Sequence, residues 1–180
     1  DFIIFDECKN LGTDHINGGR LQAYIYKNTE GLLLTTGAKK ESRFLAQSDD
    51  SIFGKILFIN LNDKSYNIFA KGLRNPQGLY VNNNIIITSE HGPRGGDELN
   101  KIAYGQNYGW PIASYGEPYG GGGSQKRNTK YLEENFYKKS HEQFDFIEPI
   151  FSYVPSIGAS ELIKIPDNLH PKWKNNFLLS

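Results

Sequence analysis

The sequence lacks the features that would place it among nucleic-acid-binding, disulfide-rich or membrane-spanning proteins. Its 180 residues carry 20 basic and 20 acidic side chains, so the positive field that nucleic-acid binding requires is missing. The single cysteine, Cys8, excludes an intrachain disulfide and fits either the cytoplasm or the periplasm. Apolar runs are short, whereas a membrane helix needs about 20 consecutive apolar residues. We therefore expect no nucleic-acid partner and no insertion into a membrane.

Methionine is absent as well, and the chain starts at Asp1 with no signal peptide ahead of the globular pattern. Either a leader has been removed or the sequence begins inside a longer protein. Residues 175–180 resemble the first half of a strand. We therefore expect a domain that is truncated at both ends.

Glycine, tyrosine and phenylalanine are abundant, with 19, 11 and 11 residues. This composition is typical of short strands joined by tight turns. Strands are expected at 1–6, 19–26, 31–36, 55–60, 66–73, 78–81, 85–90, 98–103, 147–153, 159–165 and 176–179. Their regular spacing favours an all-β sandwich, barrel or propeller. The best helix candidate is 131–143, and the glycine-rich segment 115–129 is expected to be a surface loop.

The run from Glu90 to Asn100 is the part of the sequence most suggestive of chemistry. Gly92-Pro93 and Gly95-Gly96 place four turn-forming residues within five positions, so main-chain carbonyl oxygens there can point into a cleft. Asp97 and Glu98 follow directly and add negative charge. Carbonyl and carboxylate oxygens are the ligands that Ca²⁺ prefers, in sets of about 6–8. On composition alone, the same pattern is also typical of a solvated turn.

Four blocks, at 72–79, 90–100, 105–111 and 155–160, occur in an order and spacing that resemble the glucose/sorbosone dehydrogenase family. Members are soluble aldose sugar dehydrogenases that use pyrroloquinoline quinone (PQQ), and the resemblance covers most of the chain from Asp14 onward. It implies a six-bladed β-propeller with the cofactor over the central channel. Blades of about 40–50 residues would place three to four in this chain, so residues 1–180 would form a partial propeller.

The resemblance implies that aldose sugars are oxidised at C1 to lactones, with hydride transfer to the quinone and a histidine as base. The expected partners are a small sugar substrate and an electron acceptor, and the expected location is the periplasm or the cell exterior. A non-catalytic, calcium-bearing propeller that binds a glycan or a protein is the alternative. The sequence leaves the sugar and the oligomeric state open.

The resemblance also implies roles for individual residues. The carbonyl groups of Gly92 and Pro93 would bind the Ca²⁺ that grips the quinone, and Glu98 and Tyr108 would help to hold a second, structural Ca²⁺.

The cofactor would be lined by Arg74, Asn75, His91 and Gln47. An arginine there can donate hydrogen bonds to the quinone oxygens, although a surface ion pair is the alternative for Arg74. We expect Trp110 to lie in the core.

His15 matches the catalytic base of the family, and the adjacent Asp14 could orient it. The family usually has this histidine four residues before an arginine, whereas His15 lies five residues before Arg20. Either an inserted loop residue restores His15 to the site, or it is a solvent-facing loop histidine.

Two further differences from the family concern charge. Ala38 stands where the family commonly has an aspartate, and the basic residues that neutralise the cofactor's carboxylates would lie beyond Ser180. His141 and His170 have no metal-ligand spacing and are expected at the surface.

Overall fold

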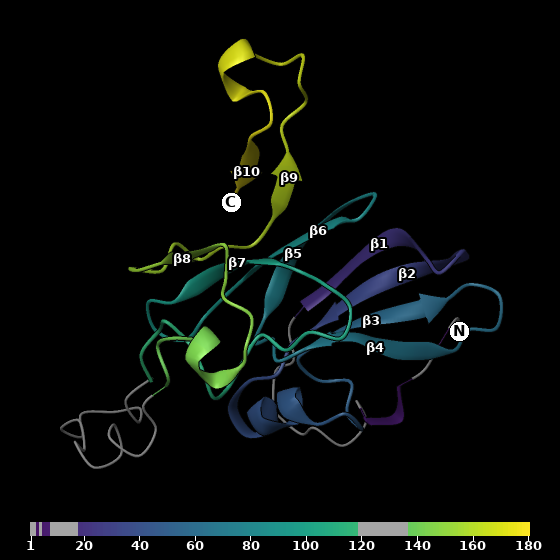
Figure 1. Ribbon diagram of the computed structural model, residues 1–180, viewed down its shortest axis with the longest axis vertical. Helices are drawn as coiled ribbons and strands as arrows, with labels where there is room; N and C mark the ends of the chain where they lie inside the picture. The colour runs from purple at the N-terminus through teal and green to yellow at the C-terminus, as the bar shows by residue number, and fades with distance from the viewer. Residues whose placement is uncertain (1–2, 4, 8–17, 119–136) are drawn as a thin grey trace.

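The computed structural model describes residues 3, 5–7, 18–118 and 137–180 (Figure 1). This part of the chain is all-β, with antiparallel strands and short 3₁₀ helices between them. The strands are β1 (Gly18–Tyr26), β2 (Thr29–Thr36), β3 (Lys55–Asn60), β4 (Tyr66–Lys71), β5 (Pro76–Asn82), β6 (Ile85–Glu90), β7 (Asp97–Lys101), β8 (Phe151–Tyr153), β9 (Leu162–Lys164) and β10 (Phe177–Leu179). Among these residues, no helix has the length and apolar character needed to cross a membrane.

The strands form two four-stranded sheets, in the order β1-β2-β3-β4 and β5-β6-β7-β8, and a two-stranded sheet of β9 and β10. The β9-β10 pair extends away from the two larger sheets (Figure 1). The three to four blades expected from the sequence are not confirmed, because the described strands complete two four-stranded sheets and part of another.

Short polar turns explain why neighbouring strands pair as meanders. Lys27 and Asn28 both have positive φ, at 48° and 63°, in the two-residue turn between β1 and β2. Asn83, at φ 51°, helps to close the equally short turn between β5 and β6. Such backbone angles match the twist of a tight hairpin, and asparagine tolerates them better than most residues.

The expected strands are largely confirmed, but the helices are not where the sequence suggested. A 3₁₀ helix, η2 (Lys40–Gln47), was not predicted. Its start is held by Ser42, whose hydroxyl accepts from the main-chain N–H of Lys39 (3.1 Å) and donates to the Lys39 carbonyl (2.7 Å). The described part of the expected helix 131–143 contains only the beginning of a short 3₁₀ helix, η3 (Glu142–Phe144). A third, η4 (Pro171–Trp173), precedes β10. The strand expected at 1–6 is not observed among its described residues.

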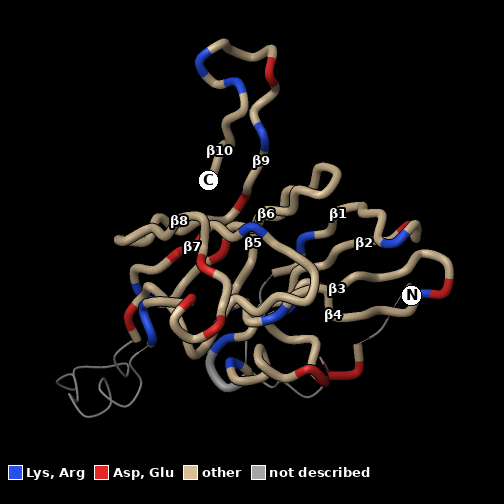
Figure 2. Tube along the Cα trace, in the orientation of Figure 1, with Lys and Arg blue, Asp and Glu red and all other residues tan. Residues whose placement is uncertain are grey.

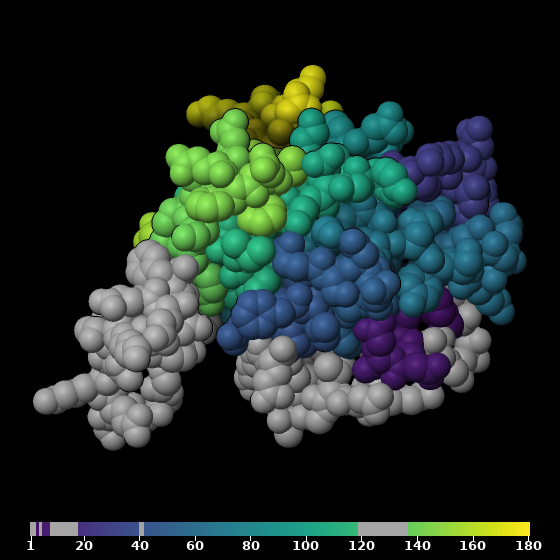
Figure 3. All heavy atoms as spheres, turned by 60° about the horizontal axis from the view of Figure 1, so that its bottom comes forward, coloured from purple at the N-terminus to yellow at the C-terminus, as the bar shows by residue number. Residues whose placement is uncertain are grey.

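The first strands of the three sheets lie side by side, because β1 contacts β5 and β5 contacts β9. A buried cluster between the larger sheets includes Leu33, Ile56, Phe58, Phe69, Leu79, Ile86 and Tyr108. Helix η2 and the residues that follow it occupy the middle of the face shown in Figure 3. Charges of both signs are interspersed along the described chain (Figure 2).

One edge of this arrangement, called the rim below, gathers strand ends from both large sheets. Gly18 in β1 pairs with Thr36 at the end of β2, and Pro76 in β5 pairs with Glu90 at the end of β6. The N–H of Ala38 donates to the carbonyl of Arg74 (2.8 Å), which joins the two sheets here. The loops at this edge carry most of the motifs that the sequence singled out.

Candidate functional site

The segment before β5 and the turn after β6 are bound tightly to each other at the rim. The main-chain N–H of Arg74 donates to Oε2 of Glu90 (2.7 Å), and its Nη1 donates to the carbonyl of His91 (2.7 Å). The N–H of His91 in turn donates to the carbonyl of Asn75 (3.1 Å). Two of the four sequence blocks therefore form one hydrogen-bonded unit.

The turn that contains Gly92 and Pro93 is closed so tightly that only glycine fits at its key positions. A Cβ atom on Gly92 would lie 1.6 Å from the carbonyl oxygen of Gly96, and one on Gly96 would lie 2.0 Å from the nitrogen of Gly116. The N–H of Gly96 donates to the carbonyl of Pro93 (3.1 Å). Since a carbonyl oxygen has two lone pairs, that of Pro93 keeps acceptor capacity for a ligand.

Asp97 connects this turn to the fourth sequence block. One carboxylate oxygen accepts from the N–H groups of Ile157 (3.2 Å), Gly158 (2.7 Å) and Ala159 (3.0 Å), and the other accepts from the N–H of Gly92 (3.1 Å). Burial raises the pKa of Asp97, but hydrogen bonds from the Ser156 side chain and from the N–H groups of Ala159, Gly158 and Gly92 outweigh burial and hold the pKa below its usual value. Asp97 is therefore a structural anion that fixes the turn.

Two buried glutamates face each other across β6 and β7. Glu90 pairs in register with Glu98, and Thr88 pairs with Asn100 one step along the same face. Glu90 accepts from the N–H groups of Arg74 and Asn75 and from Nδ2 of Asn100 (2.8 Å). Burial raises the pKa of Glu90 to about 7. Burial and then the charge of Glu90 raise the pKa of Glu98 well above its usual value.

The same cluster contains buried oxygen atoms without a hydrogen-bond partner, namely Oδ1 of Asn75 and Oδ1 of Asn100. Unpartnered amide oxygens beside two carboxyl groups make the site rich in oxygen acceptors, and a hard cation would satisfy them. Within the described residues, no group of three or more His, Cys, Asp or Glu side chains is arranged to hold a metal ion. A cation here would therefore depend on amide and main-chain oxygens as well. We call this set of Asn75, Glu90, Glu98 and Asn100 the acceptor cluster.

A small cavity at the rim reaches Glu90 and Glu98 of the acceptor cluster. It is lined by Arg74, Glu90, Gly92, Pro93, Glu98, Tyr108, Trp110, Ala113 and Ser114. The four residues predicted to bind metal and the arginine predicted to line the cofactor therefore share one cavity. The Tyr108 hydroxyl donates to the carbonyl of Lys101 (2.7 Å) and accepts from the N–H of Ala103 (2.9 Å). Tyr108 would accordingly serve a cation through its main-chain carbonyl.

Comparison with known proteins identifies the family. The model of the family described as Glucose / Sorbosone dehydrogenase matches residues 2–180. This chain belongs to that family. The family resemblance inferred from the four blocks is therefore confirmed.

Two curated members illustrate the relationship. The aldose sugar dehydrogenase YliI of Escherichia coli is 35% identical over 133 residues, which cover 66% of this chain and 35% of that protein. The quinoprotein glucose dehydrogenase B of Acinetobacter calcoaceticus is 41% identical over 80 residues, which cover 37% of this chain and 17% of that protein. This chain thus spans much less than the full length of its curated relatives.

Solved structures of family members have the same fold. The apo-form of the soluble aldose sugar dehydrogenase from Escherichia coli matches with a TM-score of 0.72 and 27% identity, covering 94% of this chain and 49% of that one. The PQQ-bound aldose sugar dehydrogenase from Streptomyces coelicolor matches with a TM-score of 0.54 and 28% identity, covering 82% and 39%.

The surface position expected for His141 is wrong. Its side chain is 1% exposed and stacks on the ring of Tyr115, with 5.4 Å between centroids. Its ring nitrogens lie 3.8 Å from Oε1 of Glu98 and 3.7 Å from Oε2 of Glu148, and neither has a hydrogen-bond partner. Burial lowers its pKa, which favours the neutral ring.

The reason for this burial is a loop closure that no local pattern reveals. The N–H groups of His141 and Glu142 donate to Oε1 of Glu148, at 2.8 and 3.1 Å. This closure folds His141 inward. The expectation for His170 is confirmed, because it is exposed.

The other residues predicted to line the cofactor hold different positions. Gln47 at the end of η2 exchanges hydrogen bonds with the Asn107 side chain (2.7 and 3.1 Å) and donates to the carbonyl of Trp110 (2.6 Å). In this structure the Gln47 amide joins two loops. His91 is partly buried at the rim, with Nε2 3.2 Å from Oε1 of Gln77.

Trp110 lies in the core as expected, and it also braces the rim. It is 6% exposed, and its Nε1 donates to the carbonyl of Ala38 (2.7 Å). The Arg74 guanidinium lies 5.4 Å from the centre of the Trp110 ring. Arg74 is thus partly buried and oriented from two sides.

Asp14 and His15 fall outside the described residues, so their catalytic roles stay predictions.

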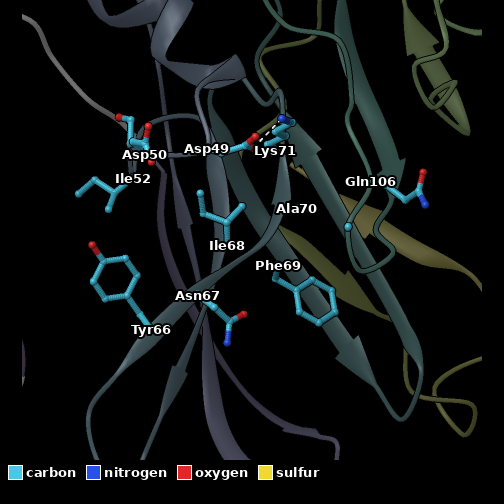
Figure 4. A pocket seen from close by; sticks show the side chains of 12 residues that line it. Asp49, Asp50, Ile52, Tyr66, Asn67, Ile68, Phe69, Ala70, Lys71 and Gln106 are labelled. Atoms are coloured by element: carbon cyan, nitrogen blue, oxygen red, sulfur yellow. Dashed lines mark hydrogen bonds and ion pairs between the residues drawn. The ribbon is translucent and has the colours of Figure 1, made fainter.

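A larger hollow, of about 440 Å³, lies away from the rim and contains none of the predicted site residues (Figure 4). It runs along β4, with the ion pair of Lys71 and Asp49 (2.6 Å) at one end and Tyr66 at the other. The ring of Phe5 already contacts Tyr66, at 5.1 Å between centroids. The larger hollow therefore does not coincide with the residues that the sequence singled out.

Proposed function

We propose that the protein containing this chain oxidises aldose sugars at C1 to lactones, with PQQ and Ca²⁺ as cofactors. The observation that carries the proposal is that Arg74, Gly92, Pro93, Glu98 and Tyr108 line one rim cavity. Relatives named aldose sugar dehydrogenase and quinoprotein glucose dehydrogenase, and a neighbour solved in a PQQ-bound form, support the same chemistry.

The protein's own groups would bind and orient the cofactors. When bound, PQQ supplies a two-electron acceptor for the hydride of the sugar. The carbonyls of Gly92 and Pro93 would hold Ca²⁺ beside it, since the tight turn fixes both peptide groups. The Arg74 guanidinium, oriented by the His91 carbonyl and the Trp110 ring, would donate hydrogen bonds to the quinone oxygens.

A base must also take the proton of the anomeric hydroxyl. We assign this role to His15, because a histidine pKa near neutrality suits proton transfer, with Asp14 orienting the ring. At the position where the family commonly has an aspartate, Ala38 is fully buried and offers no carboxylate. This difference is the observation that favours the alternative, a cation-bearing propeller that binds a glycan or a protein without catalysis.

The test is reconstitution of the full-length protein with PQQ and Ca²⁺, followed by dye reduction with several aldoses. We expect turnover in the wild type and its loss in His15→Ala, with PQQ binding retained. Arg74→Lys should lower PQQ affinity by about tenfold, because a lysine replaces two-point recognition with a point charge. Absence of turnover while PQQ is demonstrably bound would contradict the enzymatic proposal and favour the binding protein.

A further inference from the structure

Lys55 is a fully buried lysine at the start of β3, an inner strand of the first sheet. Its ammonium donates three hydrogen bonds to main-chain carbonyls, those of Leu45 (2.7 Å), Ala46 (3.0 Å) and Phe53 (2.6 Å). An ammonium has three N–H donors, so all of them are used. Lysine is almost never fully buried without such compensation, and the arrangement resembles the coordination of a small cation. We call this arrangement the lysine cage.

The cage draws two carbonyls from the end of η2 and one from the segment that follows it. Leu45 and Ala46 lie in the last turn of η2, and their carbonyls also accept from the N–H groups of Ser48 (3.1 Å) and Gly72 (3.1 Å). Phe53 lies in the connection between η2 and β3. One side chain from β3 therefore ties the end of a helix to the turn that follows it.

Lys55 keeps its charge at neutral pH although its surroundings lower its pKa. Burial and the positive charge of Lys71 lower the pKa of Lys55 to about 8, while Asp49 and Glu7 oppose the change. The three carbonyl oxygens also favour the charged form, because they accept from it. With a pKa above 7, Lys55 carries its charge at neutral pH.

The same peptide groups hold the chain that leads to Arg74. The N–H of Gly72 donates to the carbonyl of Ala46 (3.1 Å), and the N–H of Leu73 donates to the carbonyl of Gly54 (3.1 Å). A Cβ atom on Gly54 would lie 2.5 Å from the Leu73 carbonyl oxygen, so the backbones of Gly54 and Leu73 are already packed as closely as a glycine allows. Any shift of the cage would therefore move the residues directly before Arg74.

On this basis we propose that Lys55 is a positioning residue of the rim site. Its ammonium fixes the end of η2 and the 72–73 segment, and thereby sets the position of Arg74 and of Gln47, the residue after Ala46. The role of Arg74 toward PQQ rests on the proposed function, but the positioning of Arg74 by Lys55 does not.

The test compares Lys55→Met with Lys101→Met in the full-length protein. Methionine keeps the length and apolar volume of the side chain but removes the donors, and Lys101 is an exposed lysine on β7 that serves as the matched control. Without cofactor, hydrogen exchange at the amides of Gly72 and Leu73 should speed up by about tenfold or more in Lys55→Met. Amides in β5–β8 that exchange by local opening should not change, and no amide should change in the control.

PQQ titration gives the second readout, and its affinity should fall by about tenfold in Lys55→Met only. Lys55→Gln, which keeps two donors, should give a smaller change in both readouts and serves if Lys55→Met does not fold. Unchanged exchange at Gly72 and Leu73 would overturn the proposal, as would faster exchange with unaltered PQQ affinity. A wild type that binds no PQQ would instead contradict the proposed function, and the exchange result would still decide the role of Lys55.

Discussion

The lysine cage and the acceptor cluster are both buried sets of oxygen atoms, but they are neutralised differently. In the cage, three carbonyls receive hydrogen bonds from the ammonium of Lys55. In the cluster, the charges that act on Glu98 come from Glu90 and Glu148, and both raise its pKa. Two amide oxygens there have no partner. The cage is therefore complete within the chain, whereas the cluster needs protons or an added cation.

The difference matches the position of the two sets in the fold. The lysine cage is hydrogen-bonded to the 72–73 segment that leads to Arg74. In the acceptor cluster, Glu90 and Glu98 line the rim cavity. Where a positive charge is needed only to hold backbone carbonyls in place, the ammonium of a lysine side chain is sufficient. Glu90 and Glu98 line the rim cavity, so a cation bound there could reach the acceptor cluster from solution.

Removing the internal cation should have the largest effect on stability. Lys55→Met removes three hydrogen bonds donated by a buried ammonium and should lower the free energy of unfolding by about 3 kcal/mol. The carbonyls of Leu45 and Ala46 keep the N–H groups of Ser48 and Gly72 as donors, whereas that of Phe53 loses the ammonium. Denaturant unfolding of the full-length protein measures this change. A loss no larger than that of the exposed control Lys101→Met, about 0.5 kcal/mol or less, would show that the cage contributes nothing.

The acceptor cluster should make stability depend on pH when no cation is present. The folded-state pKa of Glu90 is about 7, above the usual 4.5, and that of Glu98 is also raised. Folded protein therefore binds more protons than unfolded protein between about pH 4.5 and 7, and stability falls as pH rises through this range. Thermal unfolding with a chelator at pH 5.5 and 7.5 measures it. The lowered pKa values of His91 and His141 act in the opposite direction, so the comparison is made in the double variant His91→Gln, His141→Phe, where higher stability at pH 7.5 would contradict the raised pKa values of the glutamates.

Replacing one carboxylate should stabilise the cation-free protein. In Glu98→Gln the repulsion between Glu98 and Glu90 is lost, and the new amide can donate to the unpartnered Oδ1 of Asn100. We expect a gain of about 1 kcal/mol in chelator at pH 7.5. The matched change Glu117→Gln, at a half-exposed residue paired with Lys139, should give no gain. Destabilisation by Glu98→Gln in chelator would mean that the cluster is already neutralised within the chain.

The smallest effect is expected at His141. Its ring nitrogens make no hydrogen bond, so His141→Phe keeps the stacking on Tyr115 and removes two unpartnered polar atoms. Stability should change by about 0.5 kcal/mol or less, or rise slightly. Unfolding measurements on this variant would contradict the account if they showed a loss above about 1.5 kcal/mol, since His141 would then be a required partner of Glu98 or Glu148.

The sequence predicted the strands and the rim motifs well, because both depend on local signals. Short runs of β-branched and aromatic residues bounded by tight turns mark the strands. The glycines at 92 and 96 are required by close backbone contacts that the motif preserves. Helix η2 was missed because its start depends on a single serine hydroxyl, that of Ser42. The lysine cage and the burial of His141 depend on contacts made only after folding. From the sequence alone, a lysine within a strand is expected at the surface. Lys55 is buried because the end of η2 packs over it in the folded protein.

The most direct test of the account is a calcium titration of thermal unfolding, with wild type and Glu98→Gln compared at pH 7.5. Because binding to the folded state alone stabilises it, the wild type should melt higher as Ca²⁺ is added and reach a plateau. Glu98→Gln should start higher in chelator and rise much less. Equal rises in both proteins, or no rise in the wild type, would contradict the claim that the acceptor cluster at the rim requires a cation from solution.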